Sequence, residues 1–171
     1  MTVAANSSLA RRRLLLAAAW AGLGGCGFEL RRAPELRFRS VQLIGFKANS
    51  PLAEELRRSL DASRTTLVVD TAAQAQVVFE ALADAREKSL VASTAAGLVR
   101  EVQLRARLTF TLRTPLGKEL IAPAEILLSR DMSYNEGAAL AKEQEEAALY
   151  RAMQSDIVAQ VMRRLAAVQI L

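Results

Sequence analysis

Hydrophobic and polar residues alternate without interruption from Val102 to Leu112. The even positions of this stretch are apolar, whereas the odd positions are polar or charged: Gln103, Arg105, Arg107, Thr109 and Thr111. A period of two places successive side chains on opposite faces of an extended chain. The stretch therefore predicts a β-strand with one face buried against a core and the other exposed to water.

Leucines recur at every fourth position directly after Asn49-Ser50-Pro51, namely at Leu52, Leu56 and Leu60. A spacing of four residues aligns side chains on one face of a helix. Ser50 is suited to be the N-cap, and Pro51 fits the first helical position because its missing N–H would have no partner there. This pattern predicts an amphipathic helix that begins at Pro51 and ends near residue 62.

A longer stripe with the same spacing occupies the last part of the chain. It consists of Leu149, Met153, Ile157, Val161 and Leu165, with Val158 and Val168 broadening it. Upstream, Ser133-Tyr134-Asn135-Glu136 matches a capping box, in which the serine hydroxyl and the glutamate carboxylate satisfy free amide groups at a helix start. The longest helix is therefore expected to begin at Ser133 and to pack on the sheet.

Shorter patterns complete the fold. Strands are expected at residues 40–46, 65–69, 76–86 and 119–132, a loop at residues 89–97, and a turn at residues 115–118. Pro123 cannot donate a ladder hydrogen bond, so it suggests a bulge or a sheet edge. The order of elements predicts an α+β fold, in which two helices pack on one face of a mostly antiparallel, mixed sheet of about four strands.

The N-terminal residues do not fit this domain. Three arginines, Arg11 to Arg13, precede an apolar run from Leu14 to Leu23, which is too short to span a bilayer because spanning takes about 20 residues. Gly24 and Gly25 then precede Cys26, the only cysteine of the chain. Leu23-Gly24-Gly25-Cys26 resembles the bacterial lipobox, which implies that lipid is attached to Cys26 after cleavage.

These observations predict three segments: a lipoprotein signal peptide at residues 1–25, a lipidated N-terminus and tether at residues 26–37, and a single α+β domain at residues 38–171. An uncleaved anchor and an ordinary secretory signal remain alternatives, and the arginines allow either general or twin-arginine export. Cleavage would remove three of the 23 basic residues and none of the 18 acidic ones. Bulk charge thus gives no reason to expect a polyanion-binding protein.

Composition argues against several function classes. The chain contains no histidine, the commonest general base and metal ligand, so we expect neither an enzyme nor a metal site. No glycine-rich phosphate loop occurs, and no cofactor is expected. Aromatic residues make up 5% of the chain, which leaves no stacking platform for single-stranded nucleic acid, and we expect no nucleic-acid partner.

Four cations are candidates for contact with an anionic ligand. Arg105 and Arg107 share the polar face of the clearest strand, Arg130 lies on the returning strand, and Lys142 lies near the start of the last helix. Each also has an ordinary explanation. Exposed strands carry arginine for solubility and edge protection, and Lys142 can form a helical ion pair with Glu145 or Glu146.

Two segments resemble a known family. Cys26-Gly27-Phe28-Glu29-Leu30-Arg31 follows the signal, and Ser129-Arg130-Asp131-Met132-Ser133-Tyr134-Asn135-Glu136 runs through Ala139-Leu140-Ala141-Lys142-Glu143 toward the last helix. Together they are similar to the LptE family of lipopolysaccharide-assembly lipoproteins. The resemblance extends over most of the chain in element order, whereas residues 38–99 contribute pattern only.

The resemblance implies a function that the residues alone do not. LptE-like proteins are held by their lipid at the periplasmic face of the outer membrane, sit as a plug in the LptD β-barrel and assist its assembly and lipopolysaccharide delivery, without catalysis. The residue directly after the cysteine is Gly27 and not aspartate, which is similar to lipoproteins that are sorted to the outer membrane. The implied partners are LptD, lipopolysaccharide and the outer membrane. The alternative is a stand-alone periplasmic lipoprotein that binds an amphipathic ligand or serves as a transport auxiliary.

Overall fold

The chain divides into two units, Met1–Arg32 and Ala33–Leu171. The computed structural model describes residues 35–93, 99–134 and 136–169, all within the second unit. Cys26 and residues 1–25 lie outside the described residues, so the signal peptide and the lipidation stay predictions. The elements of the second unit are β1 (Ser40–Ile44), α2 (Pro51–Ala62), β2 (Leu67–Val69), the short 3-10 helix η1 (Ala72–Gln74), β3 (Val77–Ser93), β4 (Val99–Arg113), β5 (Glu119–Ser133), the 3-10 helix η2 (Glu136–Ala138) and α3 (Ala139–Ala166).

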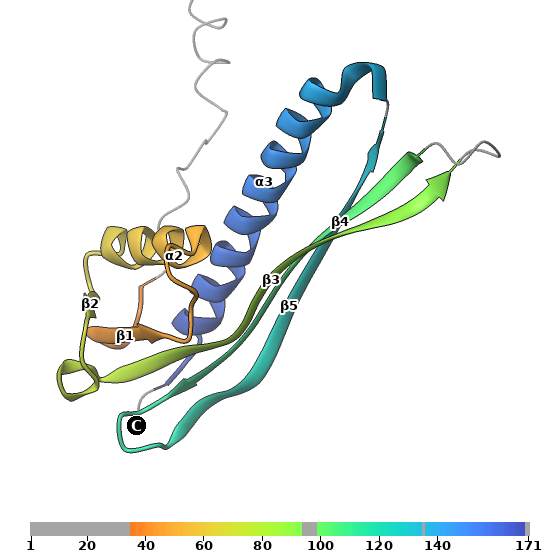
Figure 1. Cartoon of the computed structure of the whole chain (residues 1–171). Helices are drawn as coiled ribbons and strands as arrows, with labels where there is room; N and C mark the ends of the chain where they lie inside the picture. The colour runs from red at the N-terminus through yellow and green to blue at the C-terminus, as the bar shows by residue number, and fades with distance from the viewer. Residues whose placement is uncertain (1–34, 94–98, 135, 170–171) are drawn as a thin grey trace, which may run out of the picture. The chain divides into compact units, whose positions relative to one another are not determined.

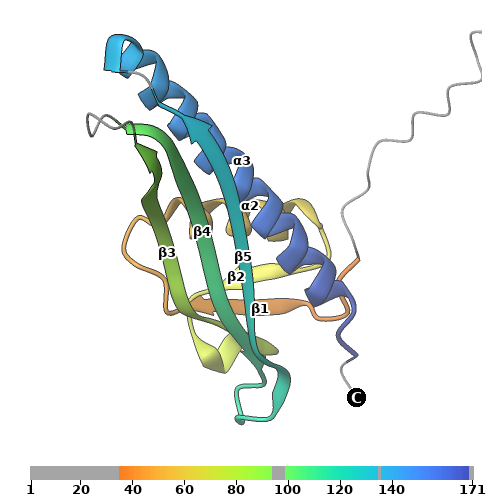
Figure 2. The same ribbon diagram turned by 90° about the vertical axis from the view of Figure 1, so that its right-hand side faces the viewer.

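The five strands form one mixed sheet in the order β2-β1-β3-β4-β5. β1 pairs in parallel with β2 and β3, whereas β3, β4 and β5 pair in antiparallel fashion. Both helices lie on the same side of this sheet, α2 by the β1–β2 end and α3 along β4 and β5 (Figures 1 and 2). The predicted α+β class is confirmed. The sheet has five strands, whereas about four were predicted.

Helix α2 begins and ends where the sequence predicted. The Ser50 hydroxyl accepts a hydrogen bond from the Ala53 amide at 3.2 Å, and Pro51 is the first helical residue. The predicted leucine stripe is buried, with Leu52, Leu56 and Leu60 at most 5% exposed. Since burying a leucine stabilises a fold by about 1.5–3 kcal/mol, this face anchors α2 to the sheet.

The alternation in β4 is also confirmed. Its even-numbered side chains from Val102 to Leu112 are at most 5% exposed and form the floor of the core under the helices. On the opposite face, Arg105 is exposed, and Arg107 and Thr109 are half-buried. Thr111 departs from the expectation of a wet face. It is 9% exposed, and its hydroxyl donates to the Ile121 carbonyl at 2.8 Å.

Two sequence predictions are wrong. Residues 89–97 were expected to form a loop, yet β3 continues to Ser93 because Ser89 and Leu90 pair with Gln103 and Val102 of β4. Residues 94–97 lie outside the described residues. The longest helix does not begin at Ser133 either, since Ser133 is the last residue of β5, and α3 begins at Ala139 with Ala138 as its N-cap.

Glycine is required at the point where β1 meets β3. Gly45 follows β1 with a φ of 82°, and a Cβ built on it would lie 2.2 Å from the carbonyl oxygen of Ala81. The pairing of β3 with β4 shifts register between Ala81 and Ala83, so the chains approach each other beside a bulge. Only a residue without a Cβ fits this approach.

Candidate binding surfaces

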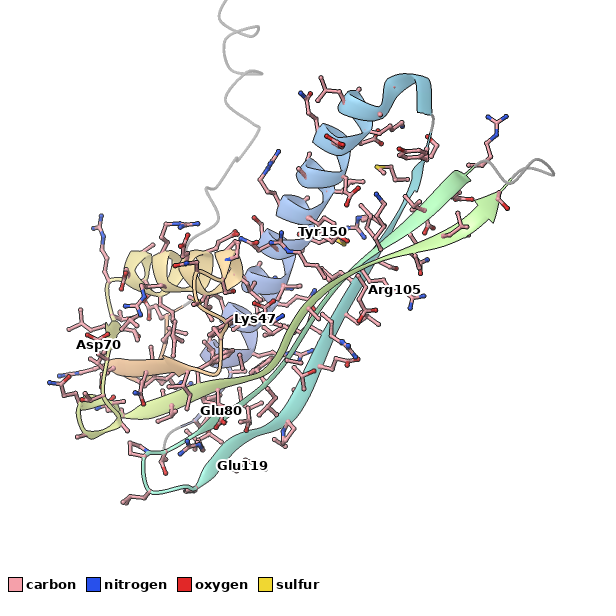
Figure 3. The ribbon with its side chains drawn as sticks, in the orientation of Figure 1. Lys47, Asp70, Glu80, Arg105, Glu119 and Tyr150 are labelled. Atoms are coloured by element: carbon pink, nitrogen blue, oxygen red, sulfur yellow. The ribbon has the colours of Figure 1, made fainter. Side chains whose placement is uncertain are left out.

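The face of the sheet that carries no helix, here called the helix-free face, holds Arg105, which points away from the helices (Figure 3). Arg107 lies on the same face, because it is two residues further along β4. The Arg107 guanidinium lies 3.0 Å from the Glu87 carboxylate of β3. Arg105 donates at 2.7 Å to the side-chain oxygen of Gln103, whose amide nitrogen donates at 2.9 Å to Asp131 of β5. Toward the other end of this face, Arg113 lies 3.3 Å from Glu80. Polar side chains therefore bridge all three antiparallel strands.

Arg130 reaches the other side of the molecule. It pairs opposite the buried Leu104, and its guanidinium lies 3.5 Å from the Asp156 carboxylate of α3. The same guanidinium donates to the backbone carbonyl of Ser129 at 3.0 Å. Arg130 thus links the outer strand to the middle of α3.

Lys142 joins the first turn of α3 to the end of β5. Its ammonium lies 2.8 Å from the Glu145 carboxylate and donates to the Ser133 hydroxyl at 3.2 Å. Of the two helical partners considered from the sequence, the structure selects Glu145, because Glu146 pairs with Lys88 of β3 at 2.6 Å. The Lys142 side chain is 18% exposed, the least of the ion-paired cations among the described residues.

The four sequence candidates therefore do not form one cluster. Arg105 and Arg107 project from the helix-free face, whereas Arg130 and Lys142 make contacts on the helix side. Any anion that contacts both pairs must reach around the edge strand β5. Contact with lipopolysaccharide stays a prediction for all four residues.

Sequence reasoning missed a cleft of about 540 Å³ between α2 and α3. Its walls and floor come from three elements: Pro51, Glu54 and Arg58 of α2, Arg86 of β3, and Glu143, Glu146, Ala147, Tyr150, Arg151 and Gln154 of α3. The α3 residues recur at three- and four-residue steps, which the sequence does show. Their position opposite α2 depends on tertiary packing and could not be read from the chain.

Gln154 organises the floor of this cleft. It is 8% exposed, and its amide nitrogen donates to the Pro51 carbonyl at 3.0 Å and to Glu55 at 2.5 Å. These bonds direct the amide oxygen of Gln154 toward Arg86, which donates to it at 2.5 Å. The guanidinium carbon of Arg86 also lies 5.4 Å from the ring centroid of Tyr150.

Tyr150 and Lys88 fasten the middle of α3 to β3. The Tyr150 hydroxyl donates to the Glu87 carbonyl at 2.8 Å. Burial, followed by the nearby Glu146 carboxylate, raises the pKa of Tyr150 above its ordinary value of 10.0. The hydrogen bond to Glu146 raises the pKa of Lys88 above 10.5. Both shifts favour the protonated forms that make these contacts.

The described part of the chain offers no group of three or more metal-ligating side chains. Among the helices of the described residues, none combines the length and the apolar character that a membrane crossing requires. The surfaces that remain are suited to binding: a polar cross-strand network on the helix-free face, paired cations around β5, and a cleft of mixed charge between the helices.

The fold and these surfaces define a two-layer α+β domain with candidate binding surfaces on both faces of its sheet. The family model for lipopolysaccharide assembly, LptE, matches residues 38–165. The chain belongs to this family of lipopolysaccharide-assembly lipoproteins, which is non-enzymatic.

Solved structures agree with this assignment. Lipoprotein B from Nitrosomonas europaea, solved by NMR, is 31% identical with a TM-score of 0.70, covering 82% of this chain and 91% of that one. The rare lipoprotein B from Shewanella oneidensis is 22% identical with a TM-score of 0.64, covering 75% and 95%. A minor lipoprotein from Acinetobacter baumannii is 19% identical with a TM-score of 0.62, covering 80% and 99%. The last two show the fold alone. No curated protein matches the chain.

Proposed function

We propose that this chain is an outer-membrane lipoprotein that acts as plug and assembly partner of the LptD β-barrel in delivering lipopolysaccharide to the cell surface. The observation that carries the proposal is the family match over residues 38–165, which spans every strand and nearly all of α3. The helix-free face supports it. Outer-membrane barrels have polar interiors, and a domain inside one must present polar groups toward the wall.

Attachment at Cys26 would hold the domain at the periplasmic face of the membrane. Each buried methylene of an acyl chain contributes about 0.8 kcal/mol, so several chains hold a protein firmly at a bilayer. Labelled palmitate should enter the normal chain and should not enter a Cys26→Ala variant. Equal labelling of both proteins would contradict the anchor.

Direct contact with lipopolysaccharide is the second part of the proposal. Lys142, Arg130, Arg105 and Arg107 are the candidates, since cationic side chains bind phosphate groups through charge-assisted hydrogen bonds. Their present partners are Glu145, Asp156, Gln103 and Glu87. Exposed ion pairs contribute roughly 0–1 kcal/mol, so a phosphate could replace these partners at little cost.

Co-purification tests the barrel partnership. In this experiment the full-length chain is expressed in its native host with a C-terminal affinity tag, and the membranes are extracted with a mild detergent. We expect a large β-barrel protein to elute with it in constant ratio. Elution of the chain alone would favour the alternative, a stand-alone lipoprotein that binds an amphipath.

Two double variants test which side meets the glycolipid. One carries Arg130→Gln and Lys142→Gln, and the other carries Arg105→Gln and Arg107→Gln. We expect the first to bind lipopolysaccharide more weakly and with less salt dependence, because neutralised cations no longer contribute a screened attraction. Unchanged binding by both variants at low salt would contradict direct contact through these residues. Unchanged melting temperatures would show that folding is intact.

A further inference from the structure

We propose that the cleft between α2 and α3 is the docking site for a segment of the partner barrel that carries a carboxylate and, about three residues away, a cation. The inference rests on the proposed function, because it assigns a surface to that partner. The carboxylate would meet Arg86 and Arg151, and the cation would meet Glu143. All three residues line the cleft.

The first argument is a difference in charge pairing. On the helix-free face, Arg107 and Arg113 are both neutralised by carboxylates of β3. In the cleft, no carboxylate of the described residues lies within ion-pair distance of Arg86 or Arg151, and no cation of these residues pairs with Glu143. The cleft therefore presents two arginines and one glutamate without ion-pair partners among the described residues, whereas on the helix-free face two arginines are paired with carboxylates and only Arg105 has a neutral partner.

The second argument is the orientation of Arg86. Its partners within the described residues are the neutral amide of Gln154 and the ring of Tyr150. Gln154 is buried and is itself fixed by bonds to α2. The guanidinium is thus held in place while most of its donors are left for a ligand. A fixed planar guanidinium suits a carboxylate, which it can bind through two parallel hydrogen bonds.

The third argument concerns the spacing of the charges. Arg86 lies over the ring of Tyr150, so Tyr150 marks the position of this cation along α3. Glu143 lies seven residues before Tyr150, which corresponds to about 10 Å along the helix axis. An extended segment rises about 3.3 Å per residue, so residues three apart match this separation. The exposed Ala147 lies between these two positions, where a small side chain leaves room for a backbone to approach.

The mixed charge of the cleft favours a protein segment over a polyanionic glycolipid. Glu54, Glu143 and Glu146 line the same cleft as the three arginines. Clustered phosphates would face these carboxylates, and like charges brought together in an interface cost binding free energy. A segment with one acid and one base avoids this repulsion.

Site-specific photo-crosslinking tests the proposal in the full-length lipidated chain, expressed in its native host. A photo-reactive residue replaces Ala147 in the cleft, and in a matched protein it replaces the exposed Ser129 of β5. We expect Ala147 to crosslink to the barrel that co-purifies with the chain. Adding Arg86→Gln and Arg151→Gln should reduce this crosslink about tenfold, as the loss of a charge-assisted hydrogen bond implies. Adding Arg57→Gln and Lys118→Gln, two exposed cations outside the cleft, should leave it unchanged.

The outcomes separate this inference from the proposed function. If the barrel co-purifies but crosslinks at Ser129 and not at Ala147, the docking site is wrong and the barrel partnership stands. A crosslink at Ala147 to glycolipid instead of protein overturns the assignment of the occupant. If the yield of the barrel crosslink at Ala147 is the same with and without Arg86→Gln and Arg151→Gln, recognition by charge is overturned. If no barrel co-purifies, the proposed function and this inference fail together.

Discussion

The two halves of α3 are held to the sheet by different forces. In the second half, from Met153 to Ala166, the inward side chains Met153, Ile157, Val161 and Leu165 are at most 2% exposed. In the first half, from Ala139 to Ala152, Leu140 is 70% exposed. The contacts of this half with the strands are largely polar and are made by Lys142, Glu146 and Tyr150. One continuous helix therefore has a hydrophobic end and a polar end.

This difference separates stability from binding. Apolar burial contributes about 25 cal/mol per Å², whereas exposed ion pairs contribute roughly 0–1 kcal/mol each. The second half of α3 thus supplies most of the attachment energy. The first half carries Lys142 and five of the ten residues that line the cleft, and its polar contacts can be exchanged for contacts with a ligand at little cost in stability.

Shortening one leucine in each half should give the largest contrast. Leu165→Ala removes a fully buried side chain, and we expect it to lower the free energy of unfolding by about 2–5 kcal/mol. Leu140→Ala removes an exposed one and should change it by less than about 0.5 kcal/mol. Urea unfolding followed by circular dichroism measures both. Equal losses would mean that the first half of α3 is packed as tightly as the second.

Outside α3, added backbone bulk should be poorly tolerated where β1 meets β3. Gly45→Ala places a Cβ against the Ala81 carbonyl, and we expect a loss of about 2–4 kcal/mol from strain and overpacking. Gly117→Ala is the matched control, because Gly117 also has a positive φ, of 91°, but a Cβ there meets nothing within 4 Å. It should cost only about 1 kcal/mol. Similar melting temperatures for the two variants would remove the steric argument.

Local patterns predicted the elements that bury an apolar face well. The strict alternation of residues 102–112 and the leucine stripe of α2 are set by burial on one face, and a face has a period that the sequence displays. Ser50 was a correct N-cap because capping depends on neighbours within three residues. The α+β class followed from the order of these elements.

The regions around the polar end of α3 were predicted less well, because their structure depends on partners that are distant in the sequence. The small residues Ser89 to Ser93 have no strand signal of their own and are extended because β4 pairs with them. Ser133 matched a capping motif, but pairing with Glu101 keeps it in β5, and its hydroxyl accepts from Lys142. The cleft was missed because Arg86, Gln154 and Pro51 meet only in three dimensions.

Gln154 lies at the boundary between the two halves of α3, and its loss should have an intermediate effect. Gln154→Ala leaves Glu55 and the Pro51 carbonyl without this donor, which should cost about 1–3 kcal/mol. Gln144→Ala on the exposed surface of the same helix is the control and should be nearly neutral. Thermal unfolding measures both proteins. Equal stability would mean that water replaces the amide without penalty.

The smallest effect should appear at alkaline pH and should be confined to the polar end. An unfolded tyrosine loses its proton near pH 10, whereas burial raises the pKa of Tyr150, so the folded state retains the proton to higher pH. The stabilisation is present below about pH 10 and is lost as the pH rises through the folded value. The raised pKa of Lys88 acts in the same direction, because its bond to Glu146 lasts until the ammonium deprotonates.

Melting temperatures measured between about pH 8 and pH 11 should therefore fall more steeply for the parent chain than for the double variant Tyr150→Phe, Lys88→Met. Lys118→Met, which alters a turn lysine with no ion pair among the described residues, should keep the parent's slope. A double variant with the parent's slope would mean that Tyr150 and Lys88 do not hold this half of the helix.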